Sequence, residues 1–111
     1  MHALVSLWQL DEARFDELMK QLKERIIPFV RQSPGFVEGY WTYDHANGKS
    51  GGFTVLDTAD RALDLKNAVE SQAETQSDPG VQLEMIRVQE IVAHVQAEGD
   101  APARREETTR F

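Results

Sequence analysis

The stretch that decides the fold spans residues 34–57 and opens with Pro34-Gly35-Phe36-Val37-Glu38-Gly39-Tyr40-Trp41-Thr42-Tyr43. A turn at Asn47-Gly48 follows, and the chain continues with Gly52-Phe53-Thr54-Val55-Leu56-Asp57. An Asn-Gly pair between two apolar segments is the strongest short-range signal for a β-hairpin. The stretch therefore predicts strands over about 36–44 and 52–57. If Asn47 and Gly48 alone form the turn, Trp41 lies opposite Thr54, although a bulge at Gly51-Gly52 would shift this register.

The segments on both sides of the hairpin complete a β-α-β-β-α-β order. Residues 3–10 and 81–95 alternate in a way that predicts the first and last strands, the last one long enough to bend or overhang the sheet. Two amphipathic helices are expected between the strands. This order predicts an α+β fold of the ferredoxin-like type, in which two helices cover one face of a four-stranded antiparallel sheet.

Apolar residues at three- and four-residue steps mark the two helices. The first is expected to begin at Asp11, a fair N-cap, and the second at Asp57 or Thr58. Pro28 lacks an amide hydrogen and disfavours helical geometry at the residue before it, so a kink or break is expected there. The stripe of the first helix is Phe15, Leu18, Met19, Leu22, Ile26 and Phe29, and that of the second is Ala62, Leu65, Val69 and Ala73.

Composition excludes several classes of function. The chain has 111 residues, which suits one domain, placed here at residues 1–97 ahead of a flexible, charged C-terminal tail at 98–111. The net charge of −7 argues against a nucleic-acid partner, because binding to a phosphate backbone depends on cationic groups. The absence of cysteine excludes disulfides and thiolate chemistry. No apolar run approaches the ~20 residues of a membrane span, so a cytoplasmic protein without a membrane partner is expected.

An RNA-recognition module shares the predicted order of elements. Its third strand carries several aromatic side chains that stack on bases. The segment from Lys49 to Leu56 offers only Phe53, so the residues disfavour this alternative.

The predicted sheet is apolar on both of its faces. The face without helices would show several of the residues Leu4, Trp8, Tyr40, Trp41, Tyr43 and Ile91 to solvent. Such a patch usually marks an interface or a ligand site. A second copy of the same sheet would cover it, and a two-fold homodimer is the commonest oligomer. The sequence therefore predicts a homodimer formed through the open sheet face.

Over about residues 2–96 the chain resembles the antibiotic-biosynthesis-monooxygenase-like (ABM) domain of the dimeric α+β barrel superfamily. The resemblance rests on Pro34 to Trp41 following a helix that ends Ile26-Ile27-Pro28-Phe29-Val30, on Gly52 to Asp57 leading into an Ala-rich helix, and on the terminal strand Val88-Gln89-Glu90-Ile91-Val92. It implies a small homodimer. If the protein is an enzyme, it implies a monooxygenase that acts without a cofactor on a small aromatic or polyketide-type substrate. The alternative is a non-catalytic homodimeric module that binds a ligand or serves as a scaffold.

The haem-degrading members of this family use an Asn late in the first strand, a Trp at the end of the third strand and a His on a later helix. Here Ser6 or a neighbour occupies the Asn region, Leu56 and Asp57 stand where the Trp would be, and the second helix has no His. These departures argue against haem breakdown.

The polyketide oxygenases of the family are similar in relying on Trp, Tyr and Arg side chains around a cavity. On this basis Arg87 and Tyr40 are candidate catalytic residues, with Arg87 steadying negative charge. The candidate ligand contacts are Ser6, Trp8, Trp41, Tyr43 and His94. The aromatic side chains have an alternative role as core and dimer contacts.

Arg87 has three open interpretations in the sequence itself. A buried arginine needs a partner, and either Glu38 or an anionic ligand would serve. At an exposed sheet rim, Arg87 would need no partner. The histidines His2, His45 and His94 are scattered without the spacing of metal ligands, so no metal site is expected.

Overall fold

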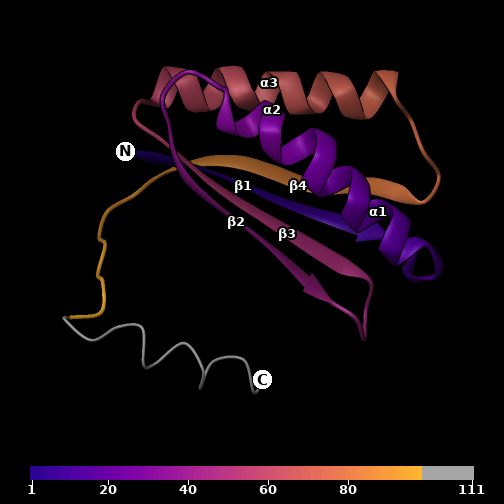
Figure 1. Ribbon diagram of the computed structural model, residues 1–111. Coiled ribbons are helices and arrows are strands. Elements are labelled where there is room, and N and C mark those ends of the chain that lie inside the picture. The colour runs from indigo at the N-terminus through magenta and orange to yellow at the C-terminus, as the bar shows by residue number, and fades with distance from the viewer. Residues whose placement is uncertain (99–111) are drawn as a thin grey trace.

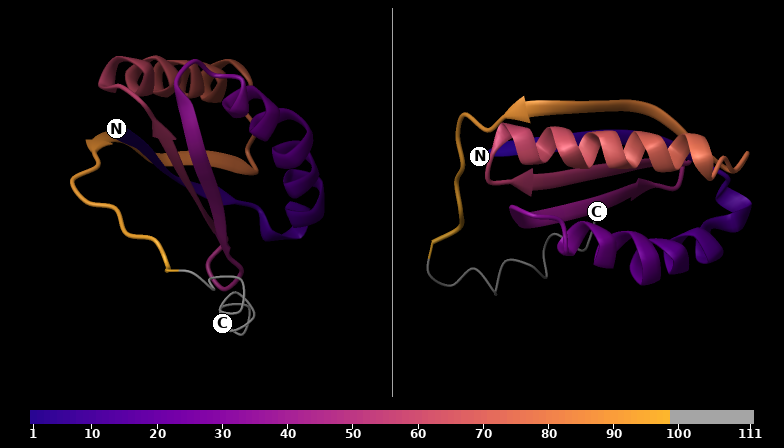
Figure 2. Two further views of the ribbon diagram at one scale, coloured as in Figure 1. Left: turned by 60° about the vertical axis from the view of Figure 1, so that its left-hand side comes forward. Right: turned by 90° about the horizontal axis from the view of Figure 1, so that it is seen from above.

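Four strands form one antiparallel sheet in the order β2-β3-β1-β4 (Figure 1). The computed structural model describes residues 1–98, and the strands are β1 (His2–Leu10), β2 (Phe36–Asp44), β3 (Lys49–Leu56) and β4 (Val81–Glu90). The helices lie on one face of this sheet (Figure 2), so the predicted ferredoxin-like α+β fold is confirmed. Residues 99–111, which hold almost all of the predicted tail, lie outside the described residues. The domain limits and the cytoplasmic location stay predictions.

The first helical segment changes its hydrogen-bonding pattern along its length. A 3-10 turn, η1 (Glu12–Arg14), leads into α1 (Phe15–Gln21), a π-helical stretch, η2 (Leu22–Ile26), and α2 (Ile27–Arg31). Asp11 caps its start as predicted, because its side chain accepts a hydrogen bond from Ala13 N at 3.0 Å. The predicted break at Pro28 is wrong, because Ile27 keeps helical backbone angles and α2 runs through the proline. The irregularity that the structure shows is the π-helical turn before it, in which Ile27 N donates to Leu22 O, five residues back.

This π-helical turn decides which apolar side chains face the sheet. The side chains of Leu18, Leu22, Ile26 and Val30 are four residues apart and would drift around a regular α-helix of 3.6 residues per turn. The wider π-helical turn offsets that drift, and all of them face the sheet layer. Val30 is buried, whereas Phe29, which the sequence placed in this stripe, is 40% exposed.

The second helix, α3 (Ala59–Thr75), packs against β1 and β4, while α2 contacts β2. Thr58 is its N-cap, since the Thr58 hydroxyl accepts a hydrogen bond from Arg61 N at 3.2 Å. Ala62 and Leu56 are fully buried where α3 meets the sheet. The core beneath the helices is a cluster of buried side chains made of Leu4, Val30, Leu56, Ala62 and Leu65. None of the described helices is long and apolar enough to cross a membrane.

The β2–β3 hairpin has a longer loop than the sequence suggested. Asp44 pairs with Lys49 and Trp41 pairs with Gly52, so the register predicted from a two-residue turn is wrong by two positions. Asp44 explains the longer loop, because its carboxylate accepts hydrogen bonds from Ala46 N and from the Asn47 side chain. A shift of two residues leaves every side chain on its predicted face.

The last strand is shorter than predicted. Glu90 pairs with His2, and Ile91 N donates to Met1 O at 3.0 Å, which is the last bond of this ladder. Strand β4 therefore ends at Glu90, where its pairing with β1 ends, and residues 91–98 lead away from the sheet (Figure 1).

The open face of the sheet carries apolar side chains, but not the predicted set. Leu4, Trp8, Trp41 and Tyr43 lie on the face that the helices cover, so their assignment to the open face is wrong. The alternation of β1 and β2 explains this, since Ala3 and Tyr40 point the other way. Tyr40 and Phe53 pair across the β2–β3 ladder and are 58% and 41% exposed. Ala3, Val5, Leu7, Val55 and Met85 share this open face.

Candidate functional site

A cavity of 180 Å³ lies between the sheet and the helices. Its floor includes Ser6, Trp8, Trp41 and Gly52, and its roof includes Leu18, Leu22, Ile26 and Leu65. Every residue that lines it is uncharged. Because an unpaired charge is costly to bury, the cavity suits a neutral and mostly apolar molecule.

Three strands place a row of site residues across the cavity floor. Gly52 on β3 pairs with Ser6 on β1 and with Trp41 on β2. A Cβ atom on residue 52 would lie 2.7 Å from Ser6 Oγ and 3.8 Å from Trp41 Nε1. The glycine therefore leaves open a gap between the Ser6 hydroxyl and the Trp41 indole.

Two hydrogen-bond donors border this gap. Trp8 Nε1 donates to Ser6 Oγ at 3.0 Å, which leaves the Ser6 hydroxyl hydrogen available to an acceptor. A hydroxyl that accepts one hydrogen bond becomes a stronger donor of the next. Within residues 1–98, Trp41 Nε1 has no acceptor. A carbonyl or phenolic oxygen of a bound molecule would satisfy both groups.

The predicted site residues are divided between two faces of the sheet. Three of the predicted ligand contacts, Ser6, Trp8 and Trp41, line the cavity. Tyr40 and Arg87 lie on the open face, where Arg87 is exposed and pairs with Val5 on the neighbouring strand. The predicted gathering of all these side chains around one cavity is not what the structure shows.

Two further candidates lie outside the cavity. His94 is exposed in the segment after β4. Glu38, the predicted partner of Arg87, lies on β2 at the opposite edge of the sheet and accepts a hydrogen bond from Tyr40 Oη at 2.9 Å. Arg87 has no ion pair within the described part of the chain, so of its three interpretations the exposed position at the sheet rim fits best.

Tyr43 belongs to a separate cluster at the hairpin end of the sheet. Its hydroxyl donates to the Glu12 carboxylate, and His45 Nδ1 lies 3.1 Å from the other oxygen of Glu12. The ring of Phe15 lies 4.7 Å from the ring of Tyr43 and 4.6 Å from that of His45. The hydrogen bond to Glu12 raises the pKa of Tyr43 to about 12. The cluster fastens the hairpin to the start of the first helix.

No protein-family model matches the chain, and no curated protein matches it in sequence. Solved structures do match it. The haem-degrader MhuD from Mycobacterium tuberculosis superposes with a TM-score of 0.66 at 17% identity, over 86% of this chain and 100% of MhuD. The monooxygenase ActVA-Orf6 of Streptomyces coelicolor, solved with nanaomycin D, gives 0.57 at 14% identity, over 86% and 92%. A dimeric ferredoxin-like protein from an uncultured marine organism gives 0.61 at 9% identity, over 87% and 100%.

The chain has the fold of the ABM-type dimeric α+β barrel proteins. The resemblance seen in the sequence is thus confirmed for the fold. In this ABM fold the cavity lies between helices and sheet, and the open sheet face lies on the other side of the β-strands.

The sequence did not single out two features of the cavity. Gly52 was assigned to a strand, but its place between Ser6 and Trp41 depends on the strand register, which was predicted wrongly from the sequence. The roof residues Leu22 and Ile26 were assigned to the helix core, although the π-helical turn brings them to the cavity. A Gly-Gly pair inside a strand was the available signal, because such a pair marks close approach or open space.

The lining of the cavity offers no imidazole that could bind the iron of a haem. The three histidines of the chain, His2, His45 and His94, all fall within the described residues, and none of them lines the cavity. Within the same residues no group of His, Asp and Glu side chains is placed to hold a metal ion.

Proposed function

We propose that this ABM-fold chain binds a small, planar, largely apolar molecule in the cavity above Gly52 and directs molecular oxygen onto it without a cofactor. One observation carries the proposal. An uncharged cavity presents the Ser6 hydroxyl and the Trp41 indole N–H on either side of the gap at Gly52. The structural similarity to ActVA-Orf6, a monooxygenase solved with nanaomycin D, supports the reaction class.

The two donors would act on the oxygen atom of the substrate. An anthrone-type substrate that loses a proton from its CH₂ group carries much of the negative charge on its carbonyl oxygen. Hydrogen-bond donors fixed around that oxygen stabilise the anion. No carboxylate or imidazole lines the cavity, so the proton passes to water.

The oxidation itself needs only the substrate anion and oxygen. The carbanion gives electrons to O₂ and forms a C–O bond, and protonation yields a hydroperoxide. Loss of water then converts the original CH₂ group into a carbonyl, with one oxygen atom in the product and one in the water. The protein supplies position and hydrogen bonds. Tyr40 and Arg87 have no part in this proposal, because both face away from the cavity.

Oxygen consumption with anthrone tests this function. Ser6→Ala removes one donor from the cavity, and turnover should fall about 100- to 1000-fold, as for other oxyanion donors. Ser71→Ala is the matched control, because Ser71 is exposed on α3. No oxygen uptake above the rate without protein, or equal uptake by both variants, would refute the monooxygenase proposal.

The exposed aromatic pair Tyr40 and Phe53 supports a second element of the proposal, a homodimer formed through the open face. A partner sheet would cover the apolar side chains of this face. A non-catalytic homodimeric module would have the same interface but would show no turnover. Trp8 lies on the helix-covered face and not at this interface. The substitution Trp8→Ala should therefore weaken ligand binding and leave the dimer intact.

A further inference from the structure

A groove of 610 Å³ runs between the helical segment η2–α2 and helix α3 and adjoins the cavity. Six residues line both spaces, namely Trp8, Gln21, Ile26, Val30, Val69 and Val81. The cavity and the groove therefore lie next to each other between the helices and the sheet. A molecule held in the cavity would reach solvent through this groove.

The groove is more polar than the cavity. Three glutamines, Gln21, Gln72 and Gln76, line it together with Arg25. Arg25 Nη2 donates to Gln76 Oε1 across the groove at 3.5 Å, which is long for a hydrogen bond. A ligand could displace this contact at little cost.

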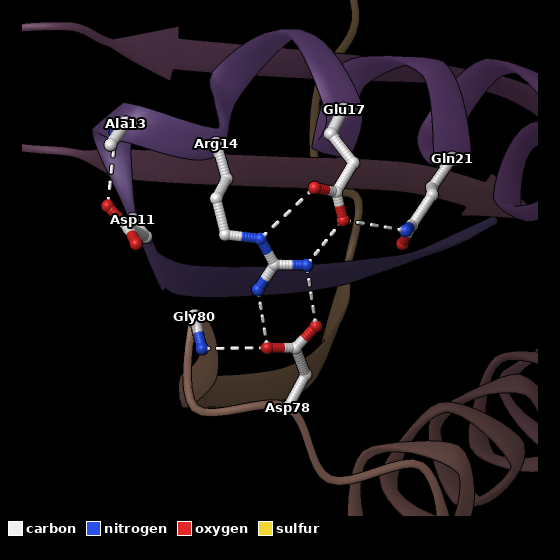
Figure 3. A network of polar contacts seen from close by, with 7 residues as sticks. All are labelled: Asp11, Ala13, Arg14, Glu17, Gln21, Asp78 and Gly80. Atoms are coloured by element: carbon white, nitrogen blue, oxygen red, sulfur yellow. Dashed lines mark hydrogen bonds and ion pairs between the residues drawn. The ribbon is translucent and has the colours of Figure 1, made fainter.

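The charges along the groove are not balanced. Its charged lining residues are Arg25 and Asp78. Arg14 binds the Asp78 carboxylate with two hydrogen bonds of 2.7 and 3.0 Å, and Gly80 N donates to it at 2.8 Å (Figure 3). Arg25, by contrast, has no ion pair among residues 1–98. Arg25 is therefore a charged residue of the groove without an ion-pair partner among residues 1–98, next to an uncharged cavity.

We propose that the ligand is an elongated aromatic acid whose ring fills the cavity and whose side chain lies in the groove and ends in a carboxylate at Arg25. This inference rests on the proposed function, because the ring must occupy the cavity. Arg25 would exchange its weak contact with Gln76 for a charge-assisted hydrogen bond. The amides of Gln72 and Gln76 would face the side chain.

Calorimetric titration of the full chain with three naphthalene probes tests this inference. 1-Naphthol carries the ring alone, 4-(1-naphthyl)butanoate adds a chain with a carboxylate, and 4-(1-naphthyl)butanamide has a neutral chain of the same length. The butanoate should bind about three- to five-fold more tightly than the amide, the range of an exposed ion pair. Arg25→Gln should abolish this preference. Arg31→Gln should keep it, because Arg31 ends α2 outside the groove.

The outcomes separate the two proposals. If naphthol does not bind, or binds Gly52→Ala as well as the native chain, the cavity proposal fails and this inference fails with it. If naphthol binds in the cavity but butanoate and amide bind equally, only the inference at Arg25 is overturned. Equal loss of the preference in Arg25→Gln and Arg31→Gln would also overturn it.

Discussion

Gly52 pairs with Ser6 across the β1–β3 ladder, and a Cβ atom on residue 52 would lie 2.7 Å from the Ser6 hydroxyl oxygen. The missing side chain keeps the cavity floor open between the Ser6 hydroxyl and the Trp41 indole. The neighbouring Gly51 is equally crowded, since a Cβ there would lie 2.6 Å from Thr42 Oγ1, but it faces the other side of the sheet. The two glycines form a natural pair for comparison.

Gly52→Ala should therefore reduce the affinity for 1-naphthol by about ten-fold, because the new methyl group occupies the cavity and crowds Ser6 at a cost of roughly 1–3 kcal/mol. Gly51→Ala introduces the same strain on the open face and should leave the affinity unchanged. Calorimetric titration measures both. Similar affinities for the two variants would show that the probe binds elsewhere.

Leu56 is completely buried beneath the helices. Leu56→Ala should lower the free energy of unfolding by about 2–5 kcal/mol, through lost apolar burial and a new void. Leu63→Ala on α3, where Leu63 is 45% exposed, should change it by less than about 0.5 kcal/mol. Urea denaturation compares the two variants. A loss at Leu56 no larger than that at Leu63 would contradict the position of the core.

The Arg14–Asp78 pair should make stability depend on pH. The hydrogen bonds from Arg14, and then that from Gly80 N, hold the pKa of Asp78 below its usual value of 3.8. Because the pKa is lower in the folded state, the stabilisation is fully present above the unfolded value and is lost as the pH falls through the folded value. Asp78→Asn should thus lower the melting temperature at pH 7 and have progressively less effect as the pH falls below 3.8.

Asp64→Asn is the control for net charge, since Asp64 is exposed on α3 and has no ion pair within residues 1–98. Thermal melts from pH 2 to 7 give the comparison. A constant difference between Asp78→Asn and the native chain over this range would be inconsistent with the pair shown in Figure 3.

Tyr43 should titrate far later than a free tyrosine. Its hydrogen bond to Glu12 raises its pKa to about 12, and the hydrogen bond to Glu38 also raises the pKa of Tyr40. In a Tyr40→Phe background only Tyr43 remains, and its absorbance at 295 nm reports its ionisation. Adding Glu12→Gln should bring the midpoint back toward 10.

The same shift predicts a loss of stability in alkali. A pKa that is raised in the folded state stabilises the protein below the unfolded value, near 10, and this contribution disappears as the pH rises through about 12. Glu12→Gln should remove this part of the alkaline dependence. An unchanged Tyr43 midpoint in that variant would argue against the contact between the hairpin and the first helix.

Phe53→Lys tests the proposed dimer, because it places a charge at the centre of the open face. The dissociation constant should rise about 30-fold or more, as for the loss of a buried aromatic anchor. Leu63→Lys is the matched control, since Leu63 is as exposed as Phe53 but lies on α3. Sedimentation velocity at micromolar concentration measures both. A monomeric native chain would rule out the dimer.

Local patterns in the sequence predicted much of this fold. Alternation along β1 put Ser6 and Trp8 on the same side of that strand, and the bounds predicted for β2 match those observed. The N-cap at Asp11 and the apolar stripe of α3 were also predicted. These features depend on neighbours within a few residues, so the sequence reports them directly.

The composition of the site could be predicted only in part. Tyr40 and Trp41 are adjacent in the sequence and equally aromatic, yet one is on the open face and the other lines the cavity. The sequence indicates that they point in opposite directions, but it does not say which direction faces the helices. The same holds for Arg87, whose exposure depends on the layer above its strand.

Local sequence patterns account for the order of the elements, the two sets of side chains on each strand and the apolar character of both faces. The tertiary structure alone decided the pairing of Gly52 with Ser6 and Trp41, the π-helical turn before Pro28 and the groove that leads to Arg25. The two groups of features differ in how far apart in the chain the interacting residues lie. Alternation and capping follow from local backbone geometry, whereas register and helix placement depend on the packing of segments that are distant in the chain.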